Sequence, residues 1–148
     1  MKYWLAIGFA TLFSACAWLP TQQAGIVVPD TDDRLYRHIE LENGLSVVLV
    51  SDAEADKAAA SLDVRVGSRH DPAEWEGLAH FLEHMLFLGT EAYPEPGEYQ
   101  AFIAANGGSH NAYTAFEHTN YFFDIEPAEL TAALDRFSAF FKSPLFNP

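Results

Sequence analysis

The chain has little cysteine and little positive charge. Cys16 is the only cysteine among 148 residues, so the chain cannot form an internal disulfide. Lysine and arginine together number 8, against 21 aspartates and glutamates, which gives a formal net charge of -13 at pH 7. Because a phosphate backbone would repel such a chain, we expect no nucleic acid partner. We interpret the acidic excess as a solvated surface that keeps the protein soluble.

The apolar run at the start of the chain is too short to span a bilayer comfortably. Within residues 1–20, Lys2 precedes this run and small residues surround Cys16 after it. That order is typical of a secretory signal, and the residues before Cys16 resemble a bacterial lipoprotein box. We therefore predict export to the bacterial periplasm, or an outer-membrane lipoprotein anchored to the membrane through a lipidated Cys16. Alternatively, Ala15 and Ala17 form a cleavage signal, and Cys16 is removed with the leader.

The rest of the chain has the composition of a globular domain. Its sequence is 49% hydrophobic and 14% aromatic, which is enough apolar material for a packed core. Residues 21–33 are interpreted as a polar tether, and residues 34–148 as one folded domain without internal repeats.

The hydrophobic pattern predicts an α+β fold, with a mostly antiparallel sheet and helices packed on one face. In chain order we expect a strand from 34 to 41, a turn at Asn43-Gly44, a strand at 45–50, a half-buried strand at 61–66, a helix from Gly77 to Gly89, a helix from 99 to 106, two extended segments within 109–126 that turn near Glu117-His118, and a helix opened by Pro127.

Two of these helices carry further expectations. The helix at 77–89 is apolar on nearly every side, so we expect it to be buried, and Gly89 to end it in a left-handed cap. The last helix is expected to lay an apolar stripe on the sheet, formed by Leu130, Leu134, Phe137 and Phe141.

Three polar side chains, His80, Glu83 and His84, interrupt the apolar helix. Residues four apart share one helix face, so both imidazoles can point at a single ion with the carboxylate beside them. A zinc ion held there lowers the pKa of a water molecule, and an adjacent carboxylate can take the proton of that water. We therefore predict that His80 and His84 bind zinc and that Glu83 is the catalytic base. A pair of core histidines hydrogen-bonded to the backbone is the alternative.

The order His-x-x-Glu-His resembles the inverse zincin motif of the pitrilysin and insulin-degrading enzyme family of zinc metallopeptidases. The similarity covers about residues 34–148 and is carried by the stretches 34–37, 41–45, 61–64, 80–90, 108–112 and 117–121. This resemblance implies peptide substrates, hydrolysed by a zinc-activated water. It also implies that Asn111 and Ala112 belong to a sheet edge on which the substrate adds as a strand.

The resemblance further implies that part of the site is missing. A catalytic zinc needs three protein ligands and an open position, and the motif supplies only two ligands. In the family the third ligand is a glutamate on a later helix, which the resemblance places beyond residue 148. We therefore expect an N-terminal portion of a longer protein, whose remainder supplies that ligand, and expect weak zinc affinity and little or no activity from the isolated chain. Glu117 or His118 is the internal alternative.

Two other functions stay open at this point. S-ribosylhomocysteine lyases share the motif, but they need cysteines that this chain lacks after Cys16. A non-catalytic partner subunit or fragment would keep only the fold. The remaining histidines are interpreted as surface residues without a metal role: His38, His70, His110 and His118.

Overall fold

The computed structural model describes residues 26–147, so the leader predicted at 1–20 and Cys16 lie outside the described part. The chain divides into two compact units, residues 1–53 and 54–148. None of the helices in the described residues has the length and apolar character that crossing a bilayer requires.

The first unit contains an antiparallel hairpin, as predicted. Strand β1 (Leu35–Glu40) pairs with β2 (Ser46–Ser51). The loop between them closes because Gly44 N donates to Leu41 O at 2.8 Å and Leu41 N donates to Leu45 O at 2.9 Å. Gly44 has a φ of +82°, which glycine adopts without steric strain.

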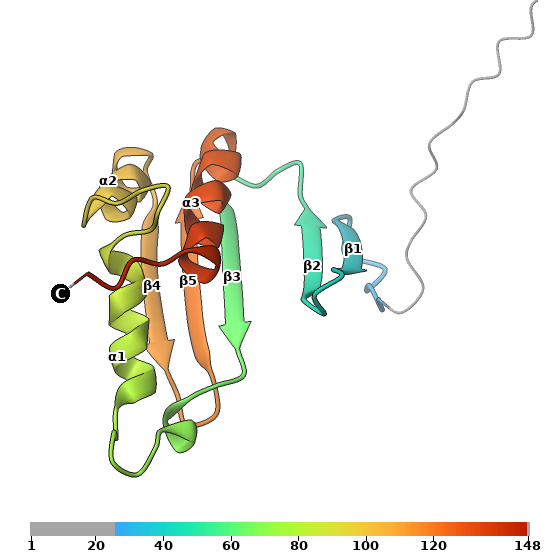
Figure 1. The fold of residues 1–148 in the computed structure, drawn as a ribbon. Helices are drawn as coiled ribbons and strands as arrows, with labels where there is room; N and C mark the ends of the chain where they lie inside the picture. Colours follow the sequence, from blue (N-terminus) through green and yellow to red (C-terminus); the bar gives the residue numbers. More distant parts are fainter. Residues whose placement is uncertain (1–25, 148) are drawn as a thin grey trace, which may run out of the picture. The chain divides into compact units, whose positions relative to one another are not determined.

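The second unit is built on a three-stranded antiparallel sheet of order β3-β5-β4 (Figure 1). Its strands are β3 (Ala58–Val64), β4 (Ser109–Thr114) and β5 (Thr119–Ile125). Alternate residues of β5 are buried: Thr119, Tyr121, Phe123 and Ile125. This alternation gives the sheet one apolar face, on which the helices pack.

The predicted position of β3 was wrong by several residues. The strand begins at Ala58, opposite Ile125, and ends at Val64, whereas the alternation had indicated 61–66. Small residues at its start still pair with β5 although they add little to the apolar pattern. Val66 leaves the ladder: its N–H donates to Val64 O at 2.7 Å, and it is 47% exposed.

The helices lie on one face of this sheet, which confirms the predicted α+β architecture (Figure 1). The helical segments, including short 3-10 turns labelled η, are η1 (Ser68–His70), α1 (Leu78–Met85), η2 (Leu86–Leu88), α2 (Glu98–Ala105), η3 (Pro127–Glu129) and α3 (Leu130–Lys142). Pro127 begins the last helical segment, as expected from its fixed φ.

The core lies between the sheet and the helices and is largely aromatic. It consists of Leu86, Tyr99, Ile103, Tyr121, Phe123, Ile125, Ala133, Phe137 and Phe140. The expected stripe on α3 is slightly rotated, because Leu134 is 40% exposed while Ala133 and Phe140 are buried. The small side chain of Ala133 lets α3 pack against the sheet. The predicted stripe left out this residue because it contained only large apolar residues.

The expected left-handed cap at Gly89 was also wrong. Helix α1 ends at Met85 and continues as the tighter turn η2. Gly89 has φ +138° and ψ +162°, outside the left-handed helical region. A Cβ atom there would lie 2.8 Å from Pro94 O, so close approach of two backbone segments requires the glycine. Gly77, immediately before α1, has a left-handed conformation with a φ of +91°.

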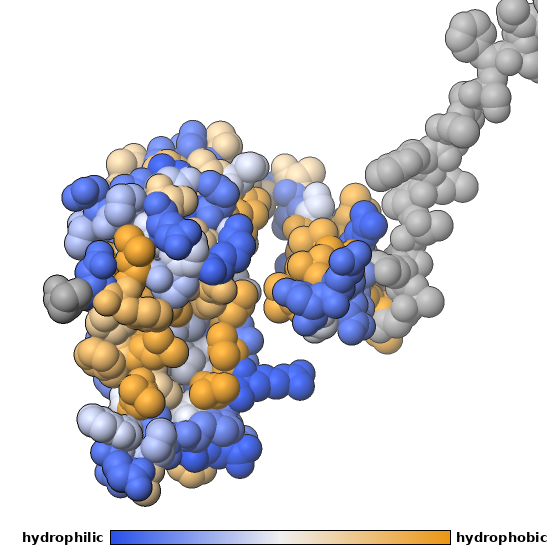
Figure 2. All heavy atoms as spheres, viewed as in Figure 1, coloured by the Kyte–Doolittle hydropathy of each residue, from blue (hydrophilic) through white to orange (hydrophobic). Residues whose placement is uncertain are grey.

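Helix α1 is far less buried than its apolar sequence indicated. Glu83 is its only buried residue, whereas Leu78, Phe81 and Leu82 are 45%, 60% and 45% exposed. Within the described part of the second unit, α1 lies against β4 and β5 of the sheet and against the short turns η1 and η2. Figure 2 shows apolar side chains gathered on the visible, helix-bearing face of this unit.

Candidate metal centre

The start of α1 is fixed by the loop that precedes it. The carboxylate of Asp71 accepts hydrogen bonds from Gly77 N and Ala79 N, both at 2.8 Å. These bonds satisfy backbone donors that the first helical turn leaves free. The helix then runs alongside β4, with which it makes most of its contacts to the sheet.

The two motif histidines converge. His80 Nε2 and His84 Nε2 lie 3.0 Å apart, and the ring centroids are separated by 4.7 Å. Zinc binds imidazole nitrogen at about 2.0–2.1 Å, and two ligands of a tetrahedral ion are then about 3.3 Å apart. A small outward movement of the rings therefore lets both nitrogens bind one ion. This geometry agrees with the predicted two-histidine site.

Glu83 lies on the inner side of the same helix and is 6% exposed. Its Oε2 accepts a hydrogen bond from Thr114 Oγ1 of β4 at 2.5 Å. Ligand atoms of His80, Glu83 and His84 all lie within 4.8 Å of one another. The two imidazole nitrogens suit zinc, and the carboxylate lies beside them, where a base would be needed.

Glu83 influences the electrostatics of a neighbouring core residue, Tyr121. Burial raises the pKa of Tyr121 to about 12, and the negative charge of Glu83 contributes to the same shift. The phenol of Tyr121 therefore stays neutral beside the carboxylate at neutral pH. A bound cation would offset the negative charge that Glu83 brings into this half-buried region.

Asn111 and Ala112 lie on β4, the strand next to α1. Within the described part of the second unit β4 pairs only with β5, so it is an edge strand. The N–H of Ala112 donates to Asn111 Oδ1 at 2.9 Å. The two residues predicted to belong to the substrate-binding edge therefore lie on an edge strand that contacts α1, the helix of His80, Glu83 and His84.

The structure does not bring the internal third-ligand candidates to the site. Glu117 forms an ion pair with Arg69, with 3.3 Å between Oε1 and Nη1. His118 Nε2 lies 3.9 Å from a carboxylate oxygen of Asp63. Across the described residues, the group at 80, 83 and 84 is the one set of potential ligands that converges.

The other histidines differ in how exposed they are. His38 and His70 are exposed, as expected. The expectation of a surface position for His110 was wrong, because its ring packs against Phe87 and Tyr99, with centroids 5.6 and 5.4 Å away. Burial lowers the pKa of His110. Its place on the inner face of β4 turns the ring toward the helices.

Thr114 was missed by the sequence reasoning. The motif stretches that carry the family resemblance leave out residues 113–116. Strand alternation contained the signal, since residues two apart share a face and His110, Ala112 and Thr114 all point inward. The pairing of this hydroxyl with Glu83 joins residues far apart in the chain, which no local pattern reveals.

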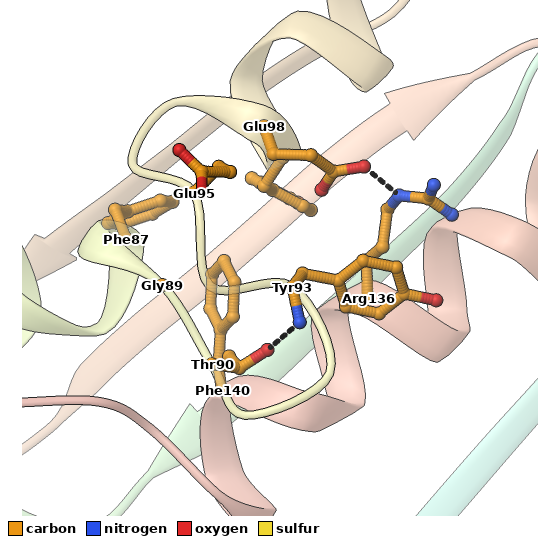
Figure 3. Close-up of a pocket in the computed structure, with 9 residues that line it drawn as sticks. Phe87, Gly89, Thr90, Tyr93, Glu95, Glu98, Arg136 and Phe140 are labelled. Atoms are coloured by element: carbon orange, nitrogen blue, oxygen red, sulfur yellow. Dashed lines mark hydrogen bonds and ion pairs between the residues drawn. The ribbon is translucent and has the colours of Figure 1, made fainter.

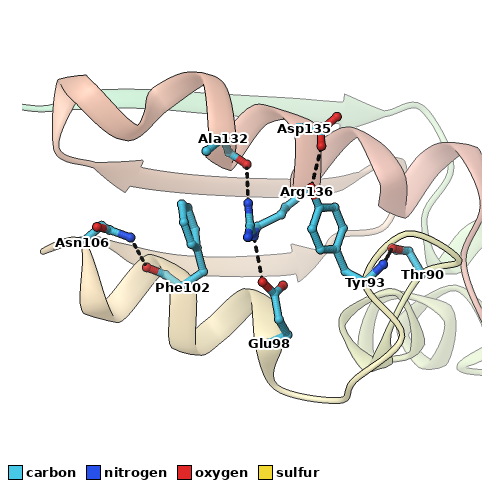
Figure 4. A network of polar contacts seen from close by, with 8 residues as sticks. All are labelled: Thr90, Tyr93, Glu98, Phe102, Asn106, Ala132, Asp135 and Arg136. Carbon is cyan, nitrogen blue, oxygen red and sulfur yellow. Dashed lines mark hydrogen bonds and ion pairs between the residues drawn. The ribbon is translucent and has the colours of Figure 1, made fainter.

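A second polar group holds α2 against α3. Arg136 Nε donates to Glu98 Oε1 at 2.9 Å, and its guanidinium lies 3.8 Å from the ring centroid of Phe102 and 4.5 Å from that of Tyr93 (Figure 4). Arg136, Tyr93 and Glu98 also line a small hollow beside Phe140 (Figure 3). We interpret this group as a structural clasp between the helices.

Comparison with known proteins shows the family of the chain. Residues 46–148 match the sequence profile described as insulinase, peptidase family M16. The chain belongs to the insulinase family. The crystal structure of pitrilysin superposes with a TM-score of 0.82 at 41% identity, over 84% of this chain and 13% of that chain.

Insulinase relatives are also close in sequence. The chain is 56% identical over 119 residues to the A-factor-processing enzyme of Saccharomyces cerevisiae, which covers 80% of this chain and 12% of the relative. It is 53% identical over 116 residues to the insulin-degrading enzyme of Homo sapiens, covering 78% of this chain and 11% of the relative. The chain thus spans about an eighth of the length of these relatives.

Proposed function

We propose that this chain carries the metal-binding helix of a zinc-dependent peptidase. The observation behind this proposal is the convergence of His80 Nε2 and His84 Nε2, 3.0 Å apart, with the buried carboxylate of Glu83 on the same helix. Membership of the insulinase family supports peptide hydrolysis as the reaction. No cysteine lies among the described residues, so the lyase alternative gains no support.

Each residue has a defined task in this reaction. His80 and His84 would hold zinc through their Nε2 atoms, which converge. When bound, zinc lowers the pKa of a water molecule and polarises the carbonyl of the peptide to be cut. Glu83 accepts a proton from the attacking water on a carboxylate oxygen and delivers it to the leaving nitrogen. Both steps need the carboxylate within hydrogen-bond reach of the reacting atoms.

The third zinc ligand is proposed to come from the remainder of a longer chain. The two histidines supply two of the three protein ligands that a catalytic zinc usually has. Glu117 pairs with Arg69, and His118 lies near Asp63, so neither reaches the site. Zinc affinity of the 148 residues alone is therefore weak in this proposal, and peptide cleavage needs the complete gene product.

An extended peptide substrate is proposed to add to the edge of β4 at Asn111 and Ala112. Main-chain pairing of this kind recognises extended conformation more than sequence. Asn111 Oδ1 now accepts the N–H of Ala112, a bond that a substrate carbonyl would replace. Asn111→Ala should raise KM more than it lowers kcat, and a loss confined to kcat would contradict the edge assignment.

Replacing the base tests the reaction. In the complete gene product that carries this chain, Glu83→Gln should abolish cleavage of a fluorogenic peptide, because an amide cannot take up the proton, while zinc content stays at the wild-type level. Glu76→Gln is the matched control, since Glu76 is exposed in the loop before α1. Cleavage by Glu83→Gln at the wild-type rate would remove this residue from the mechanism.

Replacing the ligands tests the metal. His80→Ala and His84→Ala should each lose zinc, as measured by metal analysis after gel filtration, because each removes one coordinating nitrogen. His38→Ala should retain it, since His38 Nε2 lies 2.8 Å from Ser46 Oγ in the other unit. Equal zinc content in all three variants would place the ion elsewhere.

We also propose export, which rests on the sequence of residues 1–20 alone. A lipidated Cys16 would hold the protein at a membrane, and a cleaved leader without lipid would release it to the periplasm. Mass spectrometry of the mature N-terminus separates these outcomes, and Cys16→Ser should move a lipoprotein to the soluble fraction. A protein that still begins with Met1 in the cytoplasmic fraction would contradict export.

A further inference from the structure

Glu83 is held by the sheet as well as by its own helix. The side chain is 6% exposed, and Oε2 accepts the hydroxyl proton of Thr114 at 2.5 Å. A bond of this length to a charged acceptor is of the strong, charge-assisted kind. Within the described residues, Oε1 has no hydrogen-bond partner, so one oxygen is anchored and the other is available.

Thr114 is well placed to act as this anchor. It is the last residue of β4, faces α1, and lies opposite Thr119 in the ladder. Thr119 Oγ1 lies 2.9 Å from Val66 O but 3.4 Å from Thr114 Oγ1. A hydroxyl has one proton, so Thr119 gives its proton to the nearer Val66 carbonyl. The proton of Thr114 is left for Glu83.

We propose that Thr114 is a positioning residue, whose hydroxyl fixes the Glu83 carboxylate beside the two histidines. The inference rests on the proposed peptidase function. A glutamate side chain has several rotatable bonds, and a base acts efficiently only when its oxygen is held within reach of the proton. Anchoring Oε2 to the sheet leaves Oε1 as the oxygen that takes the proton.

The kinetic test compares two threonines of the same ladder pair in the complete gene product. Thr114→Val removes the hydroxyl with little change in shape and should lower kcat about 10- to 100-fold, the usual effect of losing a supporting partner. KM and zinc content should stay near wild type, and Thr114→Ser should restore most of kcat. Thr119→Val, the matched control, should destabilise the protein but leave kcat within about threefold of wild type.

A second readout needs neither metal nor activity. In the metal-free 148-residue chain, urea unfolding of Thr114→Val, Glu83→Ala and the double variant measures whether the two side chains are coupled. We expect the double variant to lose less stability than the sum of the single losses, because both changes remove the same bond.

Different results would overturn the two proposals. If Glu83→Gln is inactive but Thr114→Val has the wild-type kcat, the positioning role is wrong and the peptidase proposal stands. The positioning role also fails if Thr114→Val and Thr119→Val lower kcat equally, if Thr114→Val loses zinc, or if the unfolding losses are additive. If Glu83→Gln cleaves as fast as wild type, the peptidase proposal itself fails.

Discussion

Gly67, in the loop that precedes α1, leaves no room for a side chain, and replacing it should be costly. Its φ of -144° is extended, so alanine would adopt the same backbone without strain. The obstacle is space: an added Cβ would lie 2.3 Å from Ala115 O, 2.6 Å from His118 N and 2.8 Å from Phe116 C. All three are backbone atoms of the turn between β4 and β5, which cannot rotate away as a side chain would.

The size of the effect follows from what must move. Ser68 N donates to Ala115 O at 3.0 Å and Arg69 N donates to Phe116 O at 2.9 Å, so pushing the turn away breaks both bonds. Overpacking costs about 1–3 kcal/mol, and each lost bond about 1 kcal/mol. Gly67→Ala should therefore lower the free energy of unfolding by about 3–5 kcal/mol.

Gly97→Ala is the matched control in the same unit. Gly97 has a φ of +86° and nothing within 4 Å of an added Cβ, so its replacement carries conformational strain alone. That strain is about 1–2 kcal/mol. Urea unfolding followed by circular dichroism measures both variants. If Gly67→Ala is no more destabilising than Gly97→Ala, close packing of the turn is not what requires the glycine.

Three further predictions concern the core and the clasp between the helices. Arg136→Lys should lower the free energy of unfolding by about 1–2 kcal/mol, because lysine cannot both pair with Glu98 and stack on Phe102; wild-type stability would show that the clasp contributes nothing. Ile103→Ala, at a fully buried position, should lower it by about 2–5 kcal/mol, and a loss below 1 kcal/mol would place Ile103 outside the core. His110→Gln should weaken the pH dependence of stability. Burial lowers the pKa of folded His110, so stability is present above the unfolded pKa of about 6.5 and is lost as the pH falls toward the folded pKa. Urea unfolding at pH 7.5 and 5.5 should show a smaller difference in the variant, and an unchanged difference would contradict the half-buried position.

Local patterns predicted the elements that depend on local chemistry. The hairpin followed from Asn43-Gly44 between two alternating runs, and the final helix from Pro127 and its periodic apolar residues. The convergence of His80 and His84 was predictable for the same reason, because a helical turn alone brings the two residues together.

Features that depend on distant parts of the chain could not be predicted in this way. The exposure of Phe81 depends on which segments pack against α1, and the sequence of α1 does not indicate which segments these are. The anchoring of Glu83 follows from the pairing of β4 and β5, which carries Thr114 to the helix. Each of these is a tertiary contact without a local signature.

NMR of the imidazole nitrogens can detect whether the two imidazoles of α1 bind one divalent ion together. Zinc would be titrated into the 148-residue chain labelled with ¹⁵N histidine, a measurement that also detects weak binding. We expect the Nε2 signals of His80 and His84 to shift together along one binding curve that saturates at one zinc per chain, while His38 stays unchanged. Separate curves for the two histidines, or shifts no larger than that of His38, would contradict this expectation.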